Sequence, residues 1–284
     1  MRVDSHQHFW KYNASRDTWI TSQMQVLKRD YLPEDLHPEM VAADVQFSVA
    51  VQADQSEIET SFLLALAEQH LFIAGVIGWV NLCSPDVSQR LQYFTRFNKL
   101  RGFRHVAQSE PDDQFLVRDD FVRGVSWLRH FDLTYDLLVY PKQLPSAVGL
   151  VDKLPDQRFV LDHLAKPLVK SRGLQTWASY IRRIAIHPNV FCKLSGLITE
   201  SDWGSWSADD FRPYLDVVFE AFGADRLMFG SDWPVCLLAG TYGQVVRLIS
   251  DYMEGRPEED CHKVFGLNAA RFYKLRVLAH GPAT

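Results

Sequence analysis

The feature that most constrains this chain is a regular alternation of short apolar runs, rich in β-branched residues, with longer amphipathic stretches. Eight such pairs follow one another, and this pattern is typical of β-α units that build a parallel sheet. The predicted strands are Val3 to Ser5, Phe47 to Gln52, Ile73 to Val80, Leu100 to Arg104, Thr134 to Val139, Phe159 to Asp162, Val190 to Leu194 and Leu227 to Gly230. The pattern predicts an α/β fold, a distorted (β/α)8 TIM barrel.

The predicted barrel accounts for the whole chain as one domain over residues 1–284. A chain of 284 residues with 47% hydrophobic content can bury one large core. No linker rich in Gly, Ser or Pro divides it. The segment from Phe9 to Asp44 is longer than the other connections and is predicted to be an elaborated first loop that covers the barrel mouth.

Three helix starts carry recognisable capping signals. Ser56 with Glu59 three residues later resembles a capping box, and Ser207 opens a similar acidic start. Ser84-Pro85-Asp86 offers a cap, a proline at the first helical position and an acid in order.

Charge and hydropathy exclude two classes of partner. A formal net charge of -5 provides no broad positive field, so we expect no nucleic-acid partner. The most apolar window, Phe62 to Leu82, is interrupted by Glu68, Gln69 and His70, so we expect no membrane span. The expected partner is a small molecule, and the sequence leaves open whether the chain forms a homo-oligomer.

The expected compartment is the cytoplasm. The N-terminus runs from Met1 directly into polar residues, with no apolar signal region. The cysteines are widely spaced and form no CxxC pair, which is typical of a reducing environment. They are Cys83, Cys192, Cys236 and Cys261.

Side chains that suit metal or proton chemistry follow three of the predicted strands. His6 and His8 follow the first strand, His163 follows the sixth and Asp232 follows the eighth. The C-terminal ends of barrel strands converge on one face, and side-chain alternation directs His6 and His8 the same way. Three imidazoles and one carboxylate are ligands that zinc or manganese accepts. An HxH pair taken alone is more often a hydrogen-bonding element near a strand end than a pair of metal ligands.

Five motifs in order resemble the lactonase branch of the amidohydrolase superfamily, closest to the L-fuconolactonases and L-rhamnonolactonases and related to the 2-pyrone-4,6-dicarboxylate lactonases. The motifs are Val3-Asp4-Ser5-His6-Gln7-His8-Phe9-Trp10, Gly102-Phe103-Arg104-His105, Leu161-Asp162-His163-Leu164-Ala165-Lys166-Pro167, Cys192-Lys193-Leu194-Ser195-Gly196 and Phe229-Gly230-Ser231-Asp232-Trp233-Pro234-Val235. The resemblance implies a barrel of the metal-dependent hydrolase type that opens a sugar-acid lactone, such as an L-fuconolactone or a related aldonolactone.

The resemblance also implies roles for the strand-end residues. Asp232 matches a general base, while His6, His8 and His163 match residues around a metal or the substrate carbonyl, with Asp232 completing the ligand set. Relatives with two metals carry a bridging lysine after strand four, where this chain has Arg104 and its neighbours. We therefore expect at most one divalent ion, zinc before manganese, or activity without metal.

A hydrolytic mechanism can be written on these residues. Asp232 takes a proton from water, which attacks the lactone carbonyl, and Arg104, His163 or the ion stabilises the oxyanion. Asp232 then returns the proton to the ring oxygen. No G-x-S-x-G elbow supports an acyl-enzyme route, and no GxGxxG or Walker loop supports nucleotide binding.

Further polar residues at strand ends are candidate substrate ligands. Arg104 and His105 end the fourth strand, Lys193 lies in the seventh and Gln52 ends the second. The competing interpretations are a loop salt bridge for Arg104 and His105, an ion pair for Lys193 and a simple strand terminus for Gln52.

Aromatic and acidic residues beside these motifs complete the set of candidates. Trp10 and Trp233 flank the proposed site and are expected to contact a sugar ring. Trp79 and Tyr135 are expected to be core packing. Asp162 should point away from His163 by strand alternation and is assigned a structural role. Asp4, on the face of His6, is a hydrogen-bonding partner of the site or an acid at the edge of the core.

Two other functions compete with lactone hydrolysis. One is a metal-dependent decarboxylase of the same superfamily, which would use a similar set of histidines and aspartate. The other is a catalytically silent barrel that binds a sugar.

Overall fold

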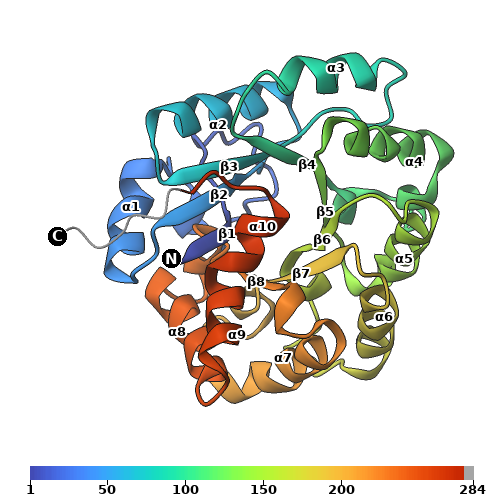
Figure 1. Ribbon diagram of the computed structural model, residues 1–284. Coiled ribbons are helices and arrows are strands. Elements are labelled where there is room, and N and C mark those ends of the chain that lie inside the picture. The colour runs from blue at the N-terminus through green and yellow to red at the C-terminus, as the bar shows by residue number, and fades with distance from the viewer. Residues whose placement is uncertain (278–284) are drawn as a thin grey trace.

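The structure, a computed structural model that describes residues 1–277, is a barrel of eight parallel strands (Figure 1). Each strand pairs with the next in sequence. The strands are β1 (Val3–Gln7), β2 (Phe47–Val51), β3 (Ile73–Gly78), β4 (Leu100–Val106), β5 (Thr134–Leu138), β6 (Phe159–Leu161), β7 (Val190–Leu194) and β8 (Leu227–Phe229). The predicted fold class is confirmed. Each predicted strand begins at the same residue as the observed strand, and the predicted and observed ends differ by at most two residues.

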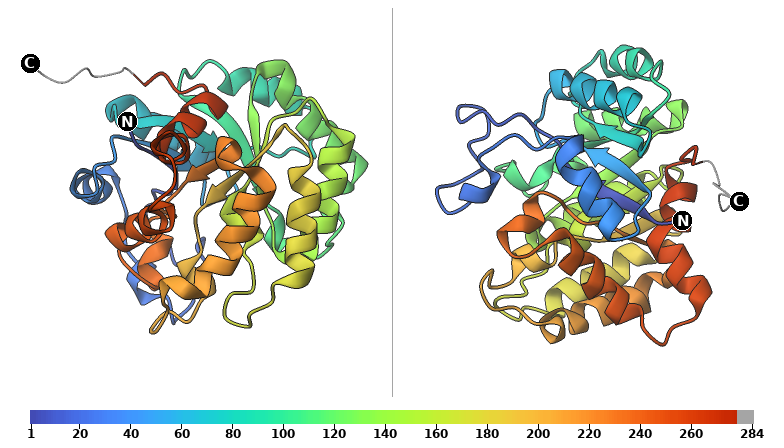
Figure 2. Two further views of the ribbon diagram at one scale, coloured as in Figure 1. Left: turned by 60° about the horizontal axis from the view of Figure 1, so that its bottom comes forward. Right: turned by 90° about the vertical axis from the view of Figure 1, so that its left-hand side faces the viewer.

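Helices surround the sheet, and one α-helix follows each strand (Figures 1 and 2). They are α1 (Pro33–Ala42), α2 (Glu57–Gln69), α3 (Val87–Phe94), α4 (Asp119–Ser126), α5 (Leu144–Lys153), α6 (Gln175–Ala185), α7 (Ala208–Phe222) and α8 (Tyr242–Met253). Two short helices, α9 (Glu258–His262) and α10 (Asn268–Phe272), are the last helices within residues 1–277. Within those residues, no helix has the length and apolar character needed to cross a bilayer.

Two of the three predicted capping signals are confirmed. Ser56 caps α2 by accepting a hydrogen bond from the backbone N–H of Glu59, and Ser207 forms a capping box at α7. The third helix, α3, begins later than predicted. Asp86 is its N-cap residue, and the hydroxyl of Ser84 donates a hydrogen bond to the Asp86 carboxylate.

The connection from Phe9 to Asp44 is only partly a loop. Its second half contains α1, which starts at Pro33, so the elaboration of this first loop includes a helix. Proline is favoured at the first helical position because it has no N–H to leave unpaired. In the first half, Trp10 and Tyr31 form an isolated antiparallel bridge, and the ring of Tyr31 lies 5.1 Å from that of Trp233.

The barrel closes between its first strand and the segment that follows its last. The backbone N–H of Asp232 donates to the carbonyl of His6 at 2.8 Å, and that of His8 donates to the carbonyl of Trp233 at 2.7 Å. These bonds place the candidate residues of β1 and of the segment after β8 directly beside one another.

The two ends of the barrel differ in chemistry. A second apolar cluster joins strand residues to the C-terminal segment, and it includes Val3, Val49, Val51, Ile77, Val160, Met228, Phe272 and Tyr273. The segment around α10 therefore packs against apolar residues of the strands. The polar side chains lie at the opposite, C-terminal ends of the strands, where active sites of such barrels are built.

Candidate active site

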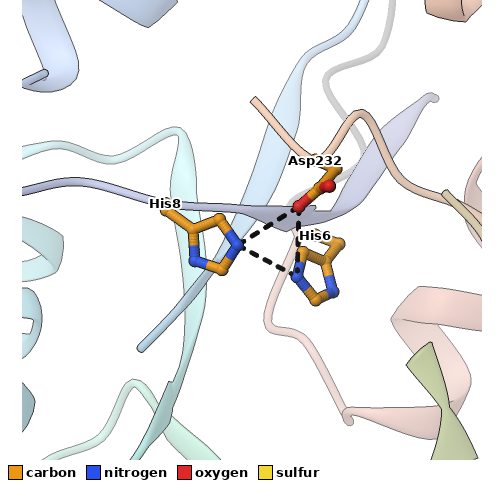
Figure 3. A group of neighbouring side chains, drawn as sticks. All are labelled: His6, His8 and Asp232. Carbon is orange, nitrogen blue, oxygen red and sulfur yellow. Dashed lines mark hydrogen bonds and ion pairs between the residues drawn. The ribbon is translucent and has the colours of Figure 1, made fainter. Parts of the chain in front are cut away.

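The predicted residues His6, His8, His163 and Asp232 meet at the C-terminal ends of the strands. All of them are buried. Nε2 of His6 lies 3.2 Å from Nε2 of His8, and Oδ1 of Asp232 lies 3.3 Å from His8 and 3.8 Å from His6 (Figure 3). His163 approaches with Nε2 at 3.8 Å from the same carboxylate oxygen. The convergence expected from strand-end positions is thus observed.

The orientation of His8 is set by the backbone of the neighbouring strand. Its Nδ1 lies 2.8 Å from the carbonyl oxygen of Val51, which can only accept a hydrogen bond. Nδ1 therefore carries a proton, so a metal ion would meet the lone pair of Nε2, the atom that faces Asp232. This is the arrangement by which a histidine presents Nε2 to a metal.

We call His6, His8, His163 and Asp232 together the centre. His163 reaches the centre because its backbone leaves the strand conformation. It has a φ of 53°, in the left-handed region that few non-glycine residues adopt. Its Nδ1 contacts the hydroxyl of Ser195 at 2.8 Å. Gly196 packs against the ring so closely that an added Cβ would lie 2.6 Å from Nδ1. The Ser195-Gly196 pair after β7 therefore fixes the imidazole.

Asp232 is held in place by hydrogen bonds that join β1 to the segment after β8. Its own φ is 57°, another strained non-glycine position. Asp4 accepts hydrogen bonds from the backbone N–H groups of Ser231 and His6, at 2.9 Å and 3.1 Å, and from the Ser231 hydroxyl at 2.6 Å. Of the two alternatives for Asp4, the structure shows the hydrogen-bonding partner of the site.

The ring of His6 is enclosed by charged groups on its Nδ1 side. Nζ of Lys193 lies 3.1 Å from Nδ1, and Oδ1 of Asp162 lies 3.4 Å from the same atom. An ammonium group only donates and a carboxylate only accepts. The hydrogen bond from Lys193 uses the lone pair of Nδ1, whereas a lone pair on Nε2 for a metal ion would require Nδ1 to carry the proton on the side of Asp162.

Arg104 lies against this group. Its Nη1 is 3.3 Å from Nε2 of His6 and 3.1 Å from Oδ2 of Asp162, and its Nη2 donates to the backbone carbonyl of Gln52. The guanidinium group thus sits beside the candidate ligands, where a developing negative charge would form.

The prediction that Asp162 points away from the site is wrong. Its carboxylate lies within reach of His6 and His163 and pairs with Arg104 at 3.1 Å and Lys193 at 2.9 Å. Asp162 continues the face of Val160 and Asp136, and His163 is the residue that departs from strand alternation, because its φ is 53°.

Lys193 does not occupy the position expected of a substrate ligand. Its side chain is fully buried, and its ammonium contacts Asp136 at 2.6 Å in addition to Asp162 and His6. The ammonium therefore has hydrogen bonds to Asp136 and His6 and an ion pair with Asp162, all inside the protein. Asp136, which also accepts from the hydroxyl of Tyr273 at 2.9 Å, is not among the predicted residues. The only signal for it in the sequence is an acid within an apolar strand.

His105 is not brought to the centre either. Its Nδ1 lies 3.3 Å from the indole nitrogen of Trp79, its Nε2 lies 2.7 Å from Glu110, and its ring stacks on Phe115. Burial lowers the pKa of His105, so Nε2 of the neutral ring donates to Glu110. Of the two alternatives, the structure favours the loop contact, as a hydrogen bond to Glu110, because side-chain alternation turns His105 away from Arg104.

The remaining candidates lie around the rim of the centre or in the core. Gln52 is buried and donates to the backbone carbonyl of Arg104 at 3.3 Å. Trp10 and Trp233 are buried in one aromatic cluster with Tyr31, and Trp10 lies 6.5 Å from the ring of His8. Tyr135 is fully buried against phenylalanines and is core packing, as predicted.

The protonation states suit a centre that activates water. Burial lowers the pKa of both His6 and His163 well below its usual value, so these imidazoles are neutral near pH 7. Burial by itself raises the pKa of Asp232, but the adjacent imidazoles of His163 and His8 outweigh it and the net pKa is lowered. Asp232 is therefore an ionised base.

The residues present fit a divalent metal ion. A tetrahedral zinc with ligand distances of about 2.0–2.2 Å separates its ligand atoms by about 3.3–3.6 Å. The separations among Nε2 of His6, Nε2 of His8 and Oδ1 of Asp232 are 3.2, 3.3 and 3.8 Å. His6, His8 and Asp232 would hold such an ion, with His163 close by.

Comparisons with known proteins agree with this site. The profile of the amidohydrolase family matches residues 3–275. An L-fucono-1,5-lactonase from Burkholderia multivorans is 45% identical over 97% of this chain and 96% of its own length, and one from Burkholderia ambifaria is 37% identical over 96% of each. A crystal structure of a Burkholderia multivorans amidohydrolase with bound zinc has a TM-score of 0.94 at 45% identity, covering 97% of this chain and 99% of that one. The chain therefore belongs to the amidohydrolase family, as its motifs predict.

Proposed function

We propose that this protein hydrolyses a sugar-acid lactone, an L-fucono-1,5-lactone, its 1,4-isomer or a related aldonolactone, to the free acid. The observation that carries the proposal is the buried group formed by His6, His8, His163 and Asp232. It is supported by relatives that share nearly the whole chain and are named L-fucono-1,5-lactonases.

Asp232 is the general base of the proposed reaction. It is ionised, and its Oδ1 lies within 3.8 Å of His6, His8 and His163. It accepts a proton from a water molecule as the water oxygen forms a bond to the lactone carbonyl carbon. When the bond from that carbon to the ring oxygen breaks, Asp232 returns the proton to the ring oxygen. The products are a carboxylic acid, which ionises, and a free hydroxyl group.

Arg104 and His163 stabilise the oxyanion in this proposal. The guanidinium group is fixed by Asp162 and by the carbonyl of Gln52, so it meets the developing charge without reorganising. Such preorganised donors contribute about 2.7–4 kcal/mol each in known enzymes. Ser195 can donate to Nδ1 of His163, which leaves Nε2–H free to donate toward the centre.

We propose one divalent ion, zinc before manganese, on His6, His8 and Asp232. When bound, such an ion polarises a carbonyl oxygen and lowers the pKa of water. The hydrogen bond from Lys193 to Nδ1 of His6, with Asp162 beside it, supports a ring position that is held with or without the ion.

Trp10 and Trp233 remain our candidates for the wall beside the sugar ring, and Gln52 remains a candidate polar contact. Their burial next to His8 and Arg104 supports these assignments. We propose the cytoplasm as the compartment, which is supported by four free cysteines.

The test is acid release from a panel of aldonolactones, followed with a pH indicator, by purified protein before and after chelation and zinc add-back. Hydrolysis of L-fucono-1,4-lactone or a related aldonolactone supports the proposal, and the chelated sample reports the role of the ion. Release of CO2 from aromatic carboxylic acids, with no lactone hydrolysis, would assign the decarboxylase function instead. Binding of sugars without turnover would indicate the silent barrel.

A further inference from the structure

The segment after β6 contains four consecutive non-glycine residues in the left-handed region. The φ values of His163, Leu164, Ala165 and Lys166 are 53°, 53°, 58° and 49°. Side chains of L-residues crowd the backbone carbonyl in this conformation, so it persists only where the surrounding structure enforces it. The turn brings His163 into the centre. It also reverses the chain within one turn, since the backbone N–H of Lys166 donates to the carbonyl of His163 at 2.7 Å.

This reversal places Lys166 at the end of the barrel that holds the site. Its Nζ lies 3.5 Å from Oε1 of Glu200, which follows β7, and 5.9 Å from the ring centre of Tyr140, which follows β5. The side chains of Lys166 and Glu200 are 18% and 19% exposed, so both reach solvent. The pair therefore belongs to the rim above the buried histidines.

Lys166 differs from the two buried cations of the site in having donors to spare. The Lys193 ammonium is fully buried among Asp136, Asp162 and His6, and Arg104 is fixed by contacts on both terminal nitrogens. Among the described residues, Glu200 is the one acidic group within 4.0 Å of the Lys166 ammonium. An ammonium has three donors, so this lysine can bind an incoming oxygen without losing its internal contact.

We propose that Lys166 binds the carbonyl end of the lactone and, more strongly, the carboxylate of the product acid, and that Glu200 competes for its ammonium. This assignment rests on the proposed lactone hydrolysis. The substrate is neutral and the product is an anion, so a cation at the rim acts mainly on the product. Lys166 then sets product inhibition and the selectivity between lactone and acid.

The test measures binding of L-fuconate by calorimetry, and its inhibition of L-fucono-1,4-lactone hydrolysis, in a set of matched variants. Lys166→Met should weaken L-fuconate binding by about tenfold or more, with a smaller rise in KM for the lactone. Lys166→Arg should restore most of the affinity. Glu200→Gln should tighten binding, because it removes the competing acid. Lys170→Met, in the same segment with an exposed side chain, is the control and should bind as the wild type does.

A purely structural ion pair gives a different pattern. Lys166→Met and Glu200→Gln would then change L-fuconate affinity in the same direction, or leave it equal to that of Lys170→Met, and either outcome overturns the assignment. Failure of the proposed function is separately visible, because wild-type protein would then not hydrolyse any lactone. Calorimetry needs no turnover, so L-fuconate affinity in Lys166→Met still decides the role of this residue.

Discussion

Nζ of Lys193 lies 3.1 Å from Nδ1 of His6, and both side chains are fully buried. The same ammonium pairs with Asp136 and Asp162, so one interior cation links a candidate ligand to two carboxylates. Buried ions are costly unless they are paired, and removing one partner leaves the others uncompensated. This relationship makes Lys193 a residue that supports the fold and the position of His6.

Replacement of Lys193 by Met is therefore expected to lower the free energy of unfolding by about 3–5 kcal/mol, because Asp136 and Asp162 lose their shared cation. The measurement is urea-induced unfolding. The control is Lys170→Met, which alters an exposed side chain and should stay within about 0.5 kcal/mol of wild type. The double variant Lys193→Met with Asp136→Asn should recover part of the lost free energy of unfolding. Equal stability of Lys193→Met and wild type would contradict the assignment of Lys193 as a residue that supports the fold.

Gly196 provides a second test, through its contact with His163. Gly196→Ala would place a Cβ 2.6 Å from Nδ1 at a φ of +63°, so the imidazole or the backbone must move. We expect at least a tenfold loss of kcat, roughly the effect of a 1.4 kcal/mol change in barrier, together with lower stability. Gly204→Ala is the matched control, because an added Cβ there meets nothing within 4 Å. Equal kcat in the two variants would show that His163 has no need of this packing.

Much of this arrangement is predictable from the sequence. Most of the strands carry apolar runs, which locate them within two residues, and the C-terminal ends of such strands converge. That is why the positions of His6, His8, His163 and Asp232 along the chain are enough to group them into one site. The left-handed backbone at His163 and Asp232, which completes their meeting, is not indicated by the order of the strands.

The wrongly placed residues have different causes. Alternation puts Asp162 and His163 on opposite faces, but a left-handed turn that begins at His163 brings both into the site, and nothing in the local pattern indicates that turn. The pairing of Lys193 with Asp136 depends on two separate strands, and Tyr273 joins them from the C-terminal segment. His105 faces away from the centre by alternation itself, because its neighbour Arg104 faces into it.

The pH dependence of the reaction follows from the lowered pKa values of the centre. Protonation of Asp232 removes the base, and the pKa of Asp232 is below the usual 3.8, so the acid limb of kcat/KM should lie below that of an ordinary carboxylate. His6 and His163 are already neutral. We expect kcat/KM to stay level from about pH 8 down to about pH 5. An acid limb with a midpoint between about pH 6 and pH 7 would instead indicate that one of these histidines ionises.

Zinc binding tests the proposed ligand set without reference to activity. Calorimetry on chelator-treated protein should show one zinc per chain, and His8→Gln should weaken this affinity by at least about 100-fold, because Nε2 of His8 is a proposed ligand. Zinc should also raise the unfolding temperature of the wild type but not of His8→Gln. His130→Gln changes an exposed histidine and serves as the control. Unchanged affinity in His8→Gln would place the ion elsewhere.

The most direct test of the account is the rate of L-fucono-1,4-lactone hydrolysis by Asp232→Asn, followed by proton NMR beside wild type. Asparagine keeps the size of the side chain but cannot take a proton, so kcat should fall by about 10²- to 10⁴-fold while the unfolding temperature is retained. Asp156→Asn, on a side chain that is 76% exposed, should keep the wild-type rate. A rate for Asp232→Asn equal to that of Asp156→Asn would contradict the assignment of Asp232 as the base that activates water.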